Sequence, residues 1–232
     1  NLSSTNKSRL EEVSNKLSEL SNKFSKNQID SVNSYELIIT NKEDVSEFPT
    51  IELDRFSKTD EEGNVSYRFG LDYPSYSAYM KYGNNRDTRK ELNMNFTNRG
   101  GDDNLNVIID ILKLRKEKAT ILGYNNYSDM RLKGMMLNTP EKVYNFIHNL
   151  SSETLINNAK EETNVLFEYS KTLGFNGDKL EQYDTNYYSN LYKTNVLSLD
   201  SLEVSKYFEK DHTVNMLFGM LDKMFNLNFQ KN

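Results

Sequence analysis

The 232-residue sequence contains no cysteine, no tryptophan, two histidines and three prolines. Without cysteine there is no disulfide framework, no thiol nucleophile and no thiolate zinc site. No apolar run approaches the roughly 20 residues that a membrane-spanning helix needs. The net charge of −5 argues against nucleic-acid binding, which normally uses a basic face. We therefore expect neither a membrane nor a nucleic acid as a partner of this chain.

The residue types that usually carry catalysis do not form a recognisable active site in this sequence. His148 and His212 lie far apart, and no His-Glu-x-x-His motif is present, so the simplest helical zinc site is absent. No Gly-x-Ser-x-Gly, phosphate-cradling glycine loop or dinucleotide fingerprint occurs either. Neighbouring acids such as Glu161 and Glu162 point in different directions on a helix, which makes shared acid-base work unfavourable. We predict no catalytic residue, no metal ligand and no cofactor in the chain itself.

Apolar residues at spacings of three and four predict a mostly α-helical fold. The first stripe of apolar residues, from Leu10 to Phe24, indicates either a helix packed on its own domain or the start of a short coiled coil. A second helix is expected to end at Gly100–Gly101, and a third to be capped by Asp102 or Asp103. Thr139-Pro140 should start a helix that continues to Gly174, roughly 50 Å long at 1.5 Å per residue. The stripes that carry these predictions are Leu10, Val13, Leu17, Leu20 and Phe24, then residues 85–98, 105–122, 143–173 and 214–225.

Two short segments are expected to be the only strands. Both 35-YELIIT-40 and 67-YRFGLD-72 have strand-like composition and polar boundaries, and 57-SKTDEEGNV-65 between them has the composition of an exposed turn. No proline- or glycine-rich linker divides the chain, and no internal repeat is present. We therefore expect residues 1–232 to form one mostly helical unit with at most one or two short strands.

Two tyrosine-rich stretches, 73-YPSYSAYMKYG-83 and 183-YDTNYYSNLY-192, are candidates for a binding surface. A tyrosine ring offers a flat apolar body with a hydrogen-bonding tip, which suits the wall of a peptide site. Core packing is the alternative, and the commoner role for any single ring. The candidates for substrate contacts are Tyr76, Tyr79, Tyr187 and Tyr188.

Four stretches, taken in order, resemble the thimet oligopeptidase family of zinc metallopeptidases, which includes dipeptidyl carboxypeptidase and oligopeptidase A. They are 69-FGLDYPSYSAYMKYGNNRDTRKEL-92, 112-LKLRKEKATILGYNNYSDMRL-132, 139-TPEKVYNFIHNL-150 and 183-YDTNYY-188. The resemblance runs from the first helix to the last. The sequence departs from the family at Tyr183, where tryptophan is usual, and at Tyr124, where phenylalanine is usual.

The resemblance implies a neurolysin-like fold, an all-helical ellipsoid split by a deep channel with zinc on its floor. This chain would supply the channel wall and the scaffold behind it. The family's His-Glu-x-x-His helix, its third zinc ligand and its catalytic histidine and tyrosine all lie beyond the position that matches Asn232. One zinc ion is therefore expected in a full-length parent, but none in this chain, which should be inactive alone.

The implied partners are the missing C-terminal catalytic part and short peptide substrates. Because the sequence begins with Asn1 rather than methionine, we expect the natural N-terminus to be missing too. No signal-peptide pattern opens the chain, although any targeting segment would be missing together with the natural N-terminus. We expect a cytoplasmic location. The alternative is a stand-alone helical domain, derived from the same fold, that binds a peptide or a protein.

Overall fold

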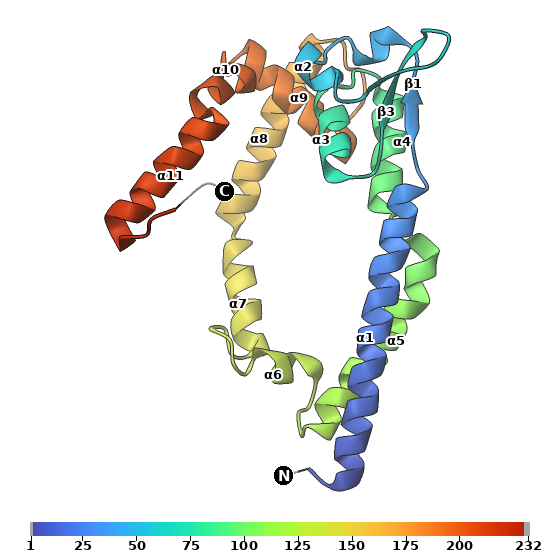
Figure 1. Cartoon of the computed structure of the whole chain (residues 1–232), viewed down its shortest axis with the longest axis vertical. Helices are drawn as coiled ribbons and strands as arrows, with labels where there is room; N and C mark the ends of the chain where they lie inside the picture. Colours follow the sequence, from blue (N-terminus) through green and yellow to red (C-terminus); the bar gives the residue numbers. More distant parts are fainter. Residues whose placement is uncertain (1, 230–232) are drawn as a thin grey trace. The chain divides into compact units, whose positions relative to one another are not determined.

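A computed structural model describes residues 2–229, and helices make up most of it (Figure 1). The mostly α-helical prediction is confirmed. By its internal contacts the chain divides into two compact units, Asn1–Tyr187 and Tyr188–Asn232, and the expectation of one helical unit within a larger peptidase stays a prediction. The boundary falls inside a helix.

The first unit contains a long helix, a small sheet and a series of further helices. In chain order these are α1 (Ser4–Asn33), β1 (Leu37–Ile39), η1 (Lys42–Val45), α2 (Thr50–Leu53), β2 (Ser57–Thr59), β3 (Val65–Phe69), α3 (Tyr73–Tyr82), α4 (Arg86–Thr97), α5 (Gly101–Ile121), α6 (Tyr127–Leu132), α7 (Pro140–Leu150), α8 (Glu153–Thr172) and the start of α9 (Gln182–Asn195). The second unit contains the rest of α9, then α10 (Ser201–Ser205), η2 (Lys206–Phe208) and α11 (Lys210–Phe225).

The sheet has three antiparallel strands in the order β1-β3-β2, so the expectation of at most two strands is wrong. The missed strand, β2, lies in the segment that we predicted to be a turn. Only the centre of this segment, 57–65, forms a turn. There the Asp60 carboxylate accepts hydrogen bonds from the backbone N–H groups of Glu62 and Asn64, at 3.0 and 2.8 Å. Gly63 takes a φ of 86°, which glycine adopts readily. This tight reversal allows the residues on either side to pair.

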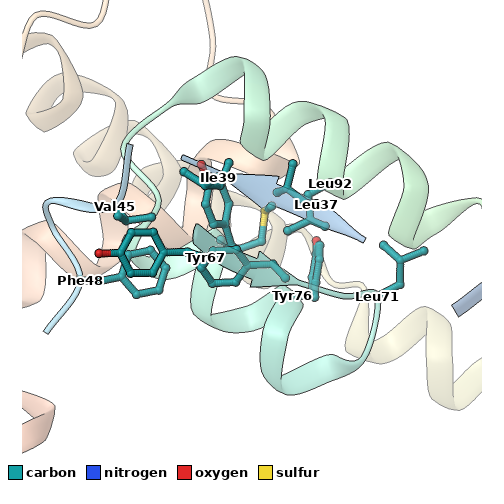
Figure 2. Close-up of a cluster of buried hydrophobic side chains, with 11 residues drawn as sticks. Leu37, Ile39, Val45, Phe48, Tyr67, Leu71, Tyr76 and Leu92 are labelled. Atoms are coloured by element: carbon teal, nitrogen blue, oxygen red, sulfur yellow. The ribbon is translucent and has the colours of Figure 1, made fainter. Parts of the chain in front are cut away.

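The main core lies between one face of the sheet and helices α3 and α4 (Figure 2). Alternation along the strands sends Leu37, Ile39, Tyr67 and Phe69 to this face. The Phe69 ring has no exposed surface and its centroid lies 4.7 to 5.5 Å from those of three other aromatic rings. Such tilted aromatic contacts add to the stabilisation from burial alone. The rings around Phe69 are Phe48, Phe56 and Tyr79.

Tyr79 is fully buried in this core, and its hydroxyl has no hydrogen-bond partner among the described residues. Burial raises the pKa of Tyr79 to about 12, whereas a tyrosine in an unfolded chain titrates near about 10. The contribution of Tyr79 to stability is therefore complete below about pH 10 and is lost as the pH rises toward 12.

We predict that Tyr79→Phe will leave the free energy of unfolding at neutral pH unchanged or raise it by up to about 1 kcal/mol, because the variant removes an unpartnered buried hydroxyl. Between pH 10 and 12 the variant should lose less stability than the parent. Denaturant unfolding across this pH range measures both effects. Parallel pH profiles of the two proteins would contradict the prediction.

Helices α1 and α5 lie side by side and antiparallel (Figure 1). Arg9, near the start of α1, donates two hydrogen bonds to Glu117, near the end of α5, at 2.6 and 3.2 Å. At the other end Asn27 donates to the side chain of Asn104 at 2.9 Å, and Asn104 donates to the carbonyl of Phe24 at 3.2 Å. The first apolar stripe therefore belongs to a helix packed on its own domain, not to a coiled coil.

The predicted cap of α5 is wrong. The helix is capped by Gly100, whose φ of 76° lies in the left-handed region that favours glycine. A side chain there would also collide with Asn104. Asp102 and Asp103 lie in the first turn instead, where their negative charges interact favourably with the positive end of the helix dipole.

The single long helix predicted from Thr139 to Gly174 is also wrong, because the structure divides it into α7 and α8. Its start is confirmed, since the Thr139 hydroxyl accepts a hydrogen bond from the backbone N–H of Lys142. The break lies at Ser151 and Ser152, and Ser152 has the extended backbone of an N-cap residue. Serine favours helix ends over helix interiors, whereas the apolar stripe continues across the break and conceals it.

Candidate functional site

A buried cluster of two arginines and one aspartate joins α4 to α9. Arg86 binds Asp184 with both ends of its fork, at 3.0 and 2.8 Å, and Arg89 reaches the same carboxylate at 3.3 Å. Asp184 has no exposed surface, and 1% of the Arg89 side chain is exposed. Two guanidinium groups thus compensate one buried carboxylate, as a charge out of water requires.

Arg89 is held from several sides at once. Its Nε donates to the carbonyl of Tyr183 at 3.0 Å, and its Nη1 donates to the carbonyls of Gly83 and Asn84 at 2.7 and 3.2 Å. The guanidinium plane lies 4.2 Å from the centroid of the Tyr187 ring. The rigid fork of arginine suits this arrangement, and the flexible ammonium of lysine could not reproduce it.

Arg86 lies at the edge of the cluster, with 39% of its side chain exposed. Its guanidinium lies 5.3 Å from the centroid of Phe175 and 4.9 Å from that of Tyr183. The hydrogen bonds to Asp184 raise the pKa of Arg86 above its ordinary value, an effect that burial opposes. Arg86 therefore stays charged and supplies the solvent-facing side of the ion pair.

Asp184 also stabilises the beginning of its own helix. Its Oδ2 accepts a hydrogen bond from the backbone N–H of Glu181 at 3.0 Å, and its negative charge lies in the first turn of α9. Four N–H groups, three of them from two arginines, donate to this carboxylate, which makes it unsuited to act as a general base. The arrangement holds the first turn of α9 against α4 within the first unit.

The structure places the four candidate tyrosines in different environments. Tyr76 and Tyr79 are buried in the core, where the Tyr76 ring stacks on Phe96 at 3.7 Å and its hydroxyl accepts a hydrogen bond from Asn93. Both rings pack in the core, and contact of either with a substrate stays a prediction. Tyr187 is half-buried over Arg89. Tyr188 is buried and belongs to the second unit. Contact of Tyr187 or Tyr188 with a substrate stays a prediction.

Sequence analysis missed Arg86, Arg89 and Asp184 as site residues. All three lie inside the stretches that resemble the oligopeptidase family, 69–92 and 183–188. The i, i+3 spacing of the arginines places them on one face of α4, which is a signal that could have been noticed. That their partner is Asp184 required the fold.

Over residues 2–229, the structure brings together no group of three or more histidine, aspartate or glutamate side chains that could hold a metal ion. Among the described helices, none is both long and apolar enough to cross a membrane.

Residues 79–232 match the family model of peptidase family M3. The chain belongs to this family. The matched range begins at Tyr79 and contains every residue of the Arg86–Arg89–Asp184 cluster. The resemblance to the thimet oligopeptidases drawn from the sequence is thereby confirmed. Peptidase family M3 is a family of zinc metallopeptidases.

The most similar relatives include two proteins named oligopeptidase A and one named saccharolysin. Oligopeptidase A of Haemophilus influenzae is 29% identical over 97% of this chain and 34% of its own length. The organellar oligopeptidase A (chloroplastic/mitochondrial) of Arabidopsis thaliana is 30% identical over 94% of this chain and 29% of its own length. Saccharolysin of Saccharomyces cerevisiae is 29% identical over 97% of this chain and 32% of its own length. The chain thus spans about a third of the length of these relatives.

Proposed function

We propose that this chain is the non-catalytic helical part of a zinc-dependent oligopeptidase, a metallopeptidase that cleaves short peptides. In this proposal it forms the wall of the substrate channel and the scaffold behind it. One observation carries the proposal: nearly the whole chain aligns with about a third of each of several oligopeptidases. Its proposed partners are the catalytic part of the same polypeptide and short peptide substrates.

Exposed apolar side chains on α7 and α8 support the proposal. Large contiguous apolar surfaces on a protein usually mark a contact with another polypeptide. We infer that these two helices pack against the catalytic part of the peptidase. The exposed residues are Tyr144, Phe146, Ile147 and Leu150 on α7, Leu155, Ile156 and Val165 on α8, and Leu173 at the C-cap of α8.

In this proposal the chain positions the substrate and the catalytic part breaks the peptide bond, and the cluster described above serves the first role. Arg86, Arg89 and Asp184 keep α4 and α9 in place, so that Tyr187 is presented at a defined position for a substrate. Bond cleavage would belong to the catalytic part, where a zinc ion, when bound, activates water as a nucleophile. We propose a cytoplasmic location for the protein, although the family also has an organellar relative.

A stand-alone helical binding domain is the second candidate function. It is favoured by a groove of about 480 Å³ along α8, where an extended or helical peptide could lie. Charges of both signs line this largely apolar groove: Lys160, Asp178 and Lys179, of which Lys179 forms an ion pair with Glu181 at 3.1 Å. Its apolar lining consists of Ile156, Ala159, Phe167 and Leu180.

We expect the purified chain, supplied with zinc, to show no hydrolysis of short peptides above background. The reason is that its 232 residues contain no His-Glu-x-x-His motif. The rate of hydrolysis is measured as the release of a fluorescent product from a short peptide, with and without a chelator. Zinc in buffer without protein gives the background rate. Cleavage that the chelator abolishes would overturn the non-catalytic role.

A further inference from the structure

Helix α11 has a broad apolar side, of which only one flank is half-buried. None of the residues of the helix is fully buried. Val214, Phe218 and Leu221 are half-buried, and the Phe218 ring stacks on Phe229 with the ring centroids 4.7 Å apart. The other flank is exposed. We call it the methionine stripe: Met216, Leu217, Met220 and Met224, with exposed fractions of 64%, 47%, 49% and 63%.

The methionine stripe has the geometry of a packing surface. At 100° per residue, its four residues fall within about 100° of one another around the helix axis. Asn215 and Asp222 fall on the opposite side, so that the helix is amphipathic. A helix of 16 residues is only marginally stable in water unless its apolar side packs against something. Methionine side chains are flexible and adapt well to the surface of a partner.

The chain that directly follows α11 covers a different flank. The helix ends at Asn226, whose φ of 53° turns the chain and whose N–H donates to the carbonyl of Asp222 at 2.7 Å. Phe229 then reaches Phe218, two turns back along the helix, so residues 226–229 run back beside α11. Phe218 lies about 160° around the helix axis from Met220. The described residues after α11 therefore leave the methionine stripe open.

The rest of the same polypeptide is the occupant that these features fit. We propose that the polypeptide beyond Asn232 packs on the methionine stripe and buries it. This inference rests on the proposed function, in which the chain continues into a catalytic part. The chain matches 34% of the length of the Haemophilus relative and 32% of that of saccharolysin, so about two thirds of each lies outside the match. Since α11 is the last helix of this chain, a continuing polypeptide starts close to the stripe.

Oxidation of methionines by hydrogen peroxide, measured by mass spectrometry of peptides, tests the proposal. The test compares this chain with the complete polypeptide encoded by the same gene. In this chain the three methionines of the stripe should oxidise nearly as fast as in the same chain unfolded in denaturant, because their sulfur atoms are open to water. In the complete polypeptide they should oxidise more slowly by about tenfold or more. Met80, which is 1% exposed, should oxidise slowly in both and serves as the internal control.

Met220→Lys tests the same contact through stability, with Asn215→Lys as the matched control. Both changes place a lysine at an exposed position of α11, but on opposite sides of the helix. In the complete polypeptide Met220→Lys should lower the unfolding temperature by several degrees, because it buries a charge without a partner. Asn215→Lys should not lower it, and in this chain neither variant should.

The possible results separate this inference from the proposed function. A complete, active peptidase whose stripe oxidises as fast as it does in this chain would overturn the inference and leave the proposed function intact. Slow oxidation in this chain alone would also overturn it, and if that protection appeared only as the concentration rose, the occupant would be a second copy. A complete polypeptide that protects the stripe but cleaves no peptide would overturn the proposed function alone.

Discussion

Asp184→Ala should lower the free energy of unfolding by about 3 to 5 kcal/mol, because it leaves Arg89 as a buried charge without its counter-ion. The three carbonyls and the aromatic ring around Arg89 cannot replace a carboxylate, since none of them carries a full negative charge. The variant also removes the acceptor at the start of α9. Denaturant unfolding, followed by the tyrosine signal in near-ultraviolet circular dichroism, measures the loss.

Arg86→Gln is the matched control for this prediction. Arg86 binds the same carboxylate through two hydrogen bonds, yet part of its side chain is in water, so its removal should cost about 1 kcal/mol or less. Equal losses for Asp184→Ala and Arg86→Gln would show that burial of Arg89 does not dominate the energetics. A loss below about 1 kcal/mol for Asp184→Ala would contradict the account of the cluster.

Phe69→Ala should destabilise the protein by a similar amount, about 3 to 5 kcal/mol, because it opens a cavity in the centre of the core. Phe69 comes from β3, has no exposed surface and contacts rings from three other segments. No neighbouring side chain can fill the space without distorting the sheet. The free energy of unfolding in denaturant measures this effect as well.

Ile38→Ala is the control, because Ile38 lies on the opposite face of the same sheet and is 51% exposed. Its truncation should cost less than about 1 kcal/mol, since little apolar area returns to water. If both truncations had the same effect, the inward face of the sheet would not be the centre of the core.

Local signals predicted most of the helices. The apolar stripes are correct for α1, α4, α5 and α11, and Thr139-Pro140 marks the start of α7. The errors arose where two local signals compete. At Ser151 and Ser152 the apolar stripe favours a continuous helix, whereas serine favours a helix end; the structure has the end there, although Ser152 forms no side-chain hydrogen bond as a cap. Around β2 the turn-forming residues obscured the two short flanks that pair.

The candidate site could not be derived from local patterns. Arg89 and Asp184 are 95 residues apart in the sequence, and only the packing of α4 against α9 brings them together. The same limit applies to the tyrosines, because identical ring types at helical spacing can be buried or exposed. Tyr79 has no exposed surface and Tyr187 is half-buried beside an arginine, a difference that only the three-dimensional neighbours determine.

Determination of the coding sequence beyond the codon for Asn232 tests the central claim most directly, namely that this chain is the wall and scaffold of an oligopeptidase. We predict an open reading frame that continues into a His-Glu-x-x-His motif, followed by the glutamate that serves as a third zinc ligand. A stop codon at or close to Asn232 would contradict the claim, and the stand-alone binding domain would then be the better account.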